Sequence, residues 1–226
     1  MAEFVEIPSP GWPLHFGEAG RPAVVIVHDA YGRLPYLEAY ARALAAQGFF
    51  VVVPDLFDGV ASIEADGAAE LEARLDPGFA LATLEDAVAI ARTPDGPAAD
   101  SGEPAERARV GLIGLGLGGR YALRLAQSGA ADAVVAYHAL LGDDEGGVIP
   151  APVLLHRADG TAWAGGVDID GFVSRLKEHG TPVTQHSYAG TVAGFANATV
   201  LRLVDRNAAA LAFARSTYFL QAQLLD

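Results

Sequence analysis

The stretch Val110-Gly-Leu-Ile-Gly-Leu-Gly-Leu-Gly-Gly119 lies at the middle of the chain and indicates its fold. Its first residues are apolar and predict a buried strand, while residues 120–128 predict a helix. The glycines between them indicate a tight turn from strand to helix. Such a strand–turn–helix unit is typical of a parallel sheet with helical crossovers.

Similar units stand on both sides of this stretch. The predicted strands are residues 23–28, 49–55, 110–113, 133–138, 152–156 and 183–188, and the predicted helices are residues 37–46, 79–92, 120–128, 168–179 and 202–220. Strands that are apolar along their whole length are covered on both faces. The alternation with helices predicts right-handed crossovers. We therefore expect an α/β fold with a mostly parallel central sheet and helices on both faces.

Two segments carry no clear pattern. Residues 94–108 are rich in Pro, Gly, Asp and Glu and predict a solvated loop. Residues 58–76 are open to interpretation, and a mobile flap over the site is one possibility. The chain has 226 residues, of which 51% are hydrophobic. Because no long linker divides it, we expect one domain over residues 1–226.

Composition excludes several classes of function. Lys and Arg total 15 and Asp and Glu total 28, so the formal charge is −13. An acidic surface repels nucleic acid and anionic lipid, and we expect neither as a partner. The absence of cysteine excludes disulfides, thiolate metal sites and a cysteine nucleophile. No signal peptide or membrane-length apolar run is visible, so we expect a cytoplasmic protein. A homo-oligomer stays open.

The order of these elements resembles the dienelactone hydrolase family, from about residue 20 to the C-terminus. These are single-domain α/β-hydrolases that open small lactones and cleave esters. The resemblance rests on Val24-Val-Ile-Val-His-Asp-Ala-Tyr-Gly32, Gly48-Phe-Phe-Val-Val-Val-Pro-Asp-Leu-Phe57, the stretch 110–119, Pro152-Val-Leu-Leu-His156 and Tyr188-Ala-Gly-Thr-Val-Ala-Gly-Phe195. It implies a nucleophile elbow at the stretch 110–119.

Residue by residue, the resemblance implies that the catalytic triad is missing. The nucleophile position is Gly116, the histidine position is Ala193, and the acid position falls on Thr161. The nearest carboxylate, Asp159, stands two residues earlier, and a short loop could still present it. Covalent hydrolysis needs a nucleophile, an imidazole base and an orienting carboxylate. We therefore predict that this chain is non-hydrolytic or strongly impaired.

The resemblance further implies a pocket with backbone donors for an oxyanion. One donor is the amide at Leu117, and the other lies on the loop with Tyr31 and Gly32. Asp29 stands where the family often has a carboxylate near the nucleophile, and it is alternatively a loop-bracing group. We expect the pocket to hold a small carbonyl or carboxylate compound. A role as a scaffold for a partner is a further possibility.

Three other residues are candidates for lining this pocket. His138 ends a strand on the site side and is either a replacement base or a structural histidine. Trp163 lies in the loop that replaces the acid loop, where it fills a vacated space or contacts a ligand. The spacing of His28, His138 and His156 matches no ligand motif, so we expect no metal, and we expect no cofactor.

Two alternative functions come from other classes. In the first, Asp29 or Asp159 together with His138 supports acid–base chemistry, or another residue supplies a hydrolytic site. In the second, Gly114, Gly116 and Gly119 bind a dinucleotide, since their spacing satisfies the G-x-G-x-x-G pattern. That pattern needs an acidic residue about 20 positions further on, and the next strand ends without one.

Overall fold

The computed structural model describes residues 3–8, 11–93 and 108–225. The strands are β1 (Val5–Glu6), β2 (Leu14–Phe16), β3 (Ala23–Val27), β4 (Phe50–Val53), β5 (Val60–Ala61), β6 (Val110–Leu115), β7 (Ala133–Tyr137), β8 (Val153–Ala158) and β9 (Val183–Tyr188). The helices are α1 (Tyr36–Ala45), α2 (Ala65–Arg74), α3 (Pro77–Ala91), α4 (Leu117–Ala126), α5 (Ile169–Glu178) and α6 (Arg206–Leu224). Two 3₁₀ turns are η2 (Asp143–Glu145) and η3 (Ala162–Ala164).

A seven-stranded sheet in the order β2-β4-β3-β6-β7-β8-β9 forms the centre of the molecule. All neighbouring strands are parallel except β2, which runs antiparallel to β4. β1 and β5 form a separate antiparallel pair. The predicted α/β class with a mostly parallel sheet is therefore confirmed.

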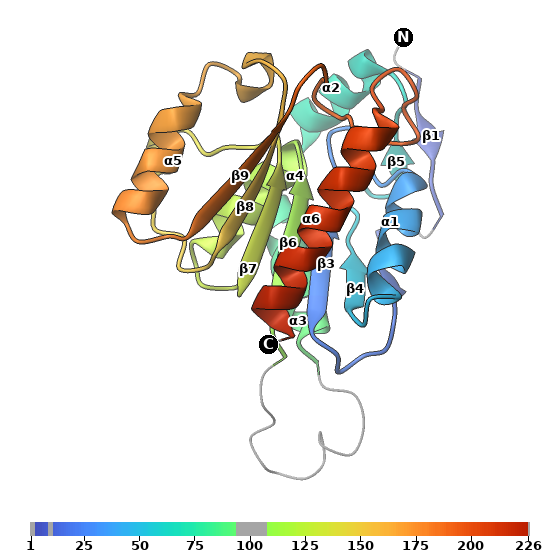
Figure 1. Ribbon diagram of the computed structural model, residues 1–226. Coiled ribbons are helices and arrows are strands. Elements are labelled where there is room, and N and C mark those ends of the chain that lie inside the picture. Colours follow the sequence, from blue (N-terminus) through green and yellow to red (C-terminus); the bar gives the residue numbers. More distant parts are fainter. Residues whose placement is uncertain (1–2, 9–10, 94–107, 226) are drawn as a thin grey trace.

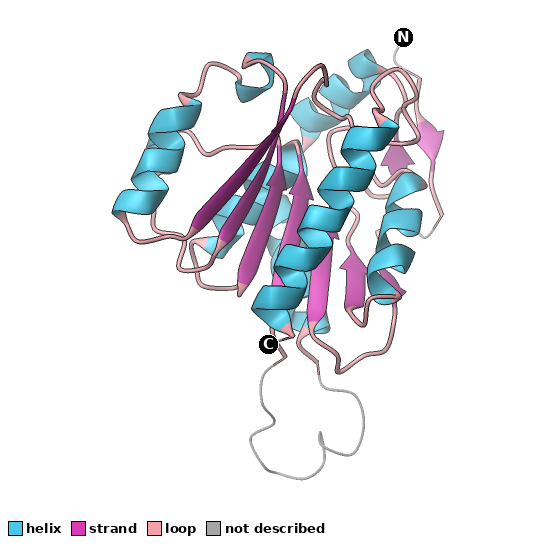
Figure 2. Cartoon of the chain, in the orientation of Figure 1, coloured by secondary structure: helices cyan, strands magenta, loops and turns pink. Residues whose placement is uncertain are grey.

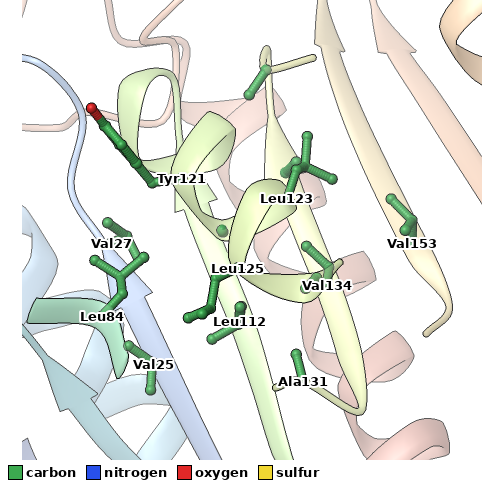
Figure 3. Close-up of a cluster of buried hydrophobic side chains, with 14 of the residues drawn as sticks. Val25, Val27, Leu84, Leu112, Tyr121, Leu123, Leu125, Ala131, Val134 and Val153 are labelled. Atoms are coloured by element: carbon green, nitrogen blue, oxygen red, sulfur yellow. The ribbon is translucent and has the colours of Figure 1, made fainter. Parts of the chain in front are cut away.

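Helices cover both faces of this sheet (Figures 1 and 2). α3, α4 and α5 contribute to one apolar core, and α1 and α6 contribute to the other. In the first core, Leu123 and Leu125 of α4 and Leu84 of α3 lie among the side chains of β3, β6 and β7 (Figure 3). Each buried aliphatic side chain of this kind stabilises the fold by about 1.5–3 kcal/mol.

The order in which strands are added to the sheet changes direction at β3. β4 pairs with one edge of β3 and β6 pairs with the other edge. In open α/β sheets, ligands bind beyond the carboxyl ends of the strands at such a reversal. Asp29 follows β3 and Gly116 follows β6, so both lie at this point.

Residues 58–76, which the sequence leaves open to interpretation, contain β5 and α2. Their sequences are short or polar and carry little periodicity. The last helix begins at Arg206 rather than at residue 202, because the carboxylate of Asp205 accepts a hydrogen bond from the Ala208 amide at 2.9 Å and caps the helix there. Most of the predicted loop 94–108 lies outside the described residues. No helix in the described part of the chain is long and apolar enough to cross a membrane.

Candidate functional site

A cavity of about 590 Å³ opens at the carboxyl end of the sheet. Loops after five strands line it: Asp29 follows β3, Gly116 follows β6, His138 follows β7, Trp163 follows β8 and Ala193 follows β9. These residues are far apart in the sequence and meet only because parallel strands end at one edge. The fold therefore brings the predicted nucleophile and histidine positions into one cavity.

Gly116 keeps the backbone conformation of a sharp strand-to-helix turn. Its φ is +49° and its ψ is −115°, and α4 begins at the next residue. A Cβ atom added at Gly116 would meet only the Cβ of Asp29, at 3.7 Å. A side chain thus has room here, while the positive φ strains every residue except glycine.

The other glycines of this stretch serve packing. A Cβ at Gly118 would lie 2.3 Å from the carbonyl oxygen of His28, and one at Gly119 would lie 2.5 Å from the Cβ of Ala139. A Cβ at Gly114 would lie 2.4 Å from the Cα of Gly119. Close approach of α4 to the sheet accounts for these glycines without a bound phosphate.

Asp29 is buried and joins three segments. Its carboxylate accepts hydrogen bonds from the Tyr31 amide at 3.0 Å, the Asn197 side-chain amide at 3.0 Å and the Tyr36 hydroxyl at 3.4 Å. Burial raises the pKa of Asp29 to about 6, and the hydrogen bonds from Asn197, Tyr31 and Tyr36 offset part of that rise. Asp29 is therefore a brace that also presents an ionisable group to the cavity.

The expected donor on the loop after β3 needs correction. The Tyr31 amide donates to the Asp29 side chain, and the Gly32 amide donates to the Asp29 carbonyl oxygen at 3.1 Å. Asp29 forms a local turn that uses both amides, a common habit of aspartate. Ala30 lines the cavity, and its amide donates to no acceptor in the described chain. The Tyr31 side chain also lines the cavity, with the Arg202 guanidinium 5.8 Å from its ring centre.

His138 lies beside the loop that carries Ala193. Its Nε2 accepts a hydrogen bond from the Gly194 amide at 3.0 Å, which places the proton of the neutral ring on Nδ1. Nδ1 is buried and has no hydrogen-bond partner among the described residues. Burial lowers the pKa of His138 to about 4. At neutral pH this side chain is a hydrogen-bond donor and a poor base.

The loop after β8 contributes an aromatic ring and no acid. Trp163 lines the cavity, and its indole N–H donates to the Gly160 carbonyl oxygen at 3.1 Å. Asp159 is exposed, accepts hydrogen bonds from the Gly160 and Gly190 amides at 2.9 and 2.7 Å, and is not among the lining residues. Thr161 is exposed and also outside the lining. The structure therefore places Asp159, which the sequence suggests as a binding residue, outside the cavity lining.

Four charged residues of the lining are absent from the sequence-based prediction. They are Glu72 of α2, Arg120 of α4, and Asp144 and Glu145 of η2. The Nε of Arg120 lies 3.1 and 3.0 Å from the two carboxylate oxygens of Glu145. The acidic run after β7 was a visible signal, but its contact with α4 depends on the tertiary fold. No serine, threonine or lysine stands among the described residues that line the cavity.

The parallel sheet, its helices and the strand-to-helix turn at Gly116 are those of the α/β-hydrolase fold. The family model for the "Dienelactone hydrolase family" matches residues 14–224, and the chain belongs to this family.

Two curated proteins are similar in sequence, and a solved structure is similar in fold. A Bradyrhizobium protein named "Probable 2-oxo-3-(5-oxofuran-2-ylidene)propanoate lactonase" is 25% identical over 170 residues, which cover 70% of this chain and 66% of that protein. An Escherichia coli protein named "Putative hydrolase fragment YghX" is 38% identical over 58 residues, covering 25% of this chain and 50% of that protein. The dienelactone hydrolase structure from Anabaena variabilis matches with a TM-score of 0.63 and 15% identity, covering 98% of both chains.

Proposed function

We propose that this protein binds a small carbonyl compound in the cavity and does not hydrolyse it through a covalent intermediate. One observation carries the proposal: Gly116 and Ala193 line the same cavity. Hydrolysis of the family type needs a nucleophile at the first position and an imidazole at the second. Neither residue has a reactive side-chain atom.

The donors that would hold a carbonyl oxygen do not depend on those side chains. The Leu117 amide is the first N–H of α4, where the helix dipole places partial positive charge. The Ala30 amide and the Nδ1 proton of His138 also belong to cavity-lining residues. A pocket of this size with a few polar groups is typical of small-molecule sites.

Acid–base chemistry at Asp29 is a second candidate function, because its carboxylate ionises near pH 6 inside the cavity. His138 is a weak partner for it, since the Gly194 amide occupies its Nε2. The two candidates differ in turnover. A carbonyl compound bound without chemistry is recovered unchanged, whereas an acid–base enzyme converts it.

The test combines activity with binding. We expect no turnover of p-nitrophenyl acetate and no labelling by a fluorophosphonate probe, together with binding of γ-butyrolactone or a simple acetate ester. Binding is followed by fluorescence in a Trp12→Phe variant, because Trp12 and Trp163 are the only tryptophans and Trp12 is 76% exposed. Labelling or turnover well above background would contradict the proposal.

A matched pair of variants shows whether the ligand occupies this cavity. Ala193→Phe places a large side chain in the lining, and we expect it to abolish binding. Ala189→Phe makes the same change at an exposed position of the same loop outside the lining, and we expect binding to persist. If both variants lose binding equally, or if both still bind, the ligand does not occupy this cavity.

A further inference from the structure

Negatively charged side chains outnumber positively charged ones in the cavity lining. The lining contains the carboxylates Asp29, Glu72, Asp144 and Glu145, and among the described lining residues Arg120 is the one arginine or lysine. Glu145 contacts Arg120 through both of its oxygens and also pairs with Arg124 at 3.7 Å, so its charge is offset. The other three carboxylates make no ion pair in the part of the chain that the structure describes. At neutral pH the cavity therefore has a net negative charge.

The buried and the exposed ends of the cavity carry different polar groups. At its inner end, the N-terminus of α4 and the Nδ1 proton of His138 offer hydrogen-bond donors. At its outer end, the exposed carboxylates of Glu72 and Asp144 come from two different elements, α2 and η2. The buried Nδ1 proton lacks a partner, which indicates an acceptor atom missing from the chain itself. A ligand with an acceptor at one end and positive charge at the other matches this arrangement.

Trp163 supplies an aromatic surface to the same lining, with its ring centre 6.5 Å from that of His138. Its indole N–H already donates to the Gly160 carbonyl oxygen, which fixes the ring and leaves the π system for a ligand. Tryptophan is the aromatic side chain that attracts cations most strongly. Aromatic surface together with carboxylates is the combination that binds ammonium groups.

We propose that this cavity selects small carbonyl compounds that carry an ammonium group, and that it discriminates against carboxylates. The proposal rests on the binding function proposed above and names its ligand class. The carbonyl oxygen lies at the donors of Leu117 and His138. The ammonium group lies at the outer end between Glu72, Asp144 and the Trp163 ring.

Three esters of similar size test the charge preference. Acetylcholine carries a permanent positive charge, 3,3-dimethylbutyl acetate is its neutral isostere, and monomethyl succinate is an anion. Binding to the Trp12→Phe protein is measured at pH 7.5 and low ionic strength. We expect acetylcholine to bind about tenfold more tightly than the neutral ester, and the anion to bind more weakly than both. Salt at about 0.5 M reduces the advantage of acetylcholine and leaves the neutral ester unchanged.

Paired variants locate the origin of the preference. Glu72→Gln with Asp144→Asn is expected to remove most of the advantage of acetylcholine and to leave binding of the neutral ester intact. The control Asp66→Asn with Asp143→Asn removes the same charges from α2 and η2 outside the lining, and the preference should persist. Equal affinity for acetylcholine and its isostere overturns this inference alone. Failure of all three esters to bind overturns it together with the proposed function.

Discussion

The Oγ of Ser216 lies 2.9 Å from the Nε2 of His156. This serine–histidine pair is fully buried between α6 and the sheet and is not part of the cavity lining. The hydroxyls of Tyr137 and Tyr188 extend the network, at 3.0 Å from Ser216 and 2.8 Å from the Nδ1 of His156. Burial lowers the pKa of His156 to about 3. The Ser216 hydroxyl donates to the Ala212 carbonyl oxygen at 2.9 Å, so the Nε2 of neutral His156 donates to Ser216 and its Nδ1 accepts from Tyr188. The pair is therefore structural.

Ser216→Ala should therefore destabilise the fold and leave ligand binding unchanged. The substitution removes a partner from the Tyr137 hydroxyl, the Nε2 of His156 and the Ala212 carbonyl oxygen. Tyr137 keeps its contact with Tyr40, whereas Nε2 is left unpaired, which costs about 1–3 kcal/mol of unfolding free energy. Thr217→Val is the matched control, since the Oγ1 of Thr217 is buried and has no hydrogen-bond partner among the described residues. That variant should be neutral or slightly more stable. Denaturant unfolding measures both, and equal losses would contradict this account.

Gly116→Ser should lower stability without creating an esterase. The side chain has room, so the cost is backbone strain at positive φ, about 1–3 kcal/mol. Gly116→Ala separates that strain from any effect of the hydroxyl. We expect hydrolysis of p-nitrophenyl acetate at background for Gly116→Ser and above background only when Ala193→His is added. Substantial turnover by the single variant would show that another base already serves this position.

Gly118→Ala should be more damaging than Gly116→Ala. The new Cβ at residue 118 would lie 2.3 Å from the carbonyl oxygen of His28, and neither backbone segment can move without unpacking α4. We expect a loss of about 3 kcal/mol or more, or failure to fold. Thermal unfolding of the two variants side by side tests the order. The reverse order would mean that strain at Gly116 dominates over packing at Gly118.

Asp29→Asn should change the pH dependence of stability. The folded-state pKa of Asp29 is raised from 3.8 to about 6. Its contribution is therefore fully present below the pKa of the unfolded chain and is lost as the pH rises through about 6. Relative to the native protein, Asp29→Asn should gain about 2 kcal/mol between pH 4.5 and 7.5. The free energy of unfolding of both proteins is measured at the two pH values. Comparing the two values cancels any cost of the substitution that does not depend on pH.

Glu18→Gln is the control for this pH experiment, because that carboxylate is 75% exposed and experiences little burial. A similar gain in the two variants would attribute the effect to net charge. A gain confined to Asp29→Asn would attribute it to burial of that carboxylate.

The sequence predicts the central elements well and the peripheral ones poorly. β9 has the predicted bounds of residues 183–188, and the other core strands differ from their predictions by a few residues at their ends. Apolar periodicity identifies them because both faces of the sheet are buried. β1, β2 and β5 have only two or three residues, too few for a period. α2 is short and polar, and burying a few small residues gives it little pattern.

The site residues also fall into two groups, those that strand ends predict and those that depend on tertiary contacts. Asp29, Leu117 and His138 follow strands directly, so strand ends predict their convergence on one cavity. Asp159 also follows a strand, but its carboxylate binds the Gly190 amide and is held away from the lining. The ion pair between Arg120 and Glu145 joins α4 to η2, and no local pattern predicts that contact. Loop direction and long-range ion pairs are tertiary properties.

The strand-to-helix turn at Gly116, which has no reactive side-chain atom, affects how long a bound ester stays in the cavity. In a hydrolase, an ester leaves the pocket either intact or as products, and the chemical step shortens its stay. Under the proposed function, only the first exit is open, because Gly116 has no side chain to form an acyl intermediate. The residence time of a bound ester is then set by dissociation, and the same compound that enters the crevice is the one that leaves it.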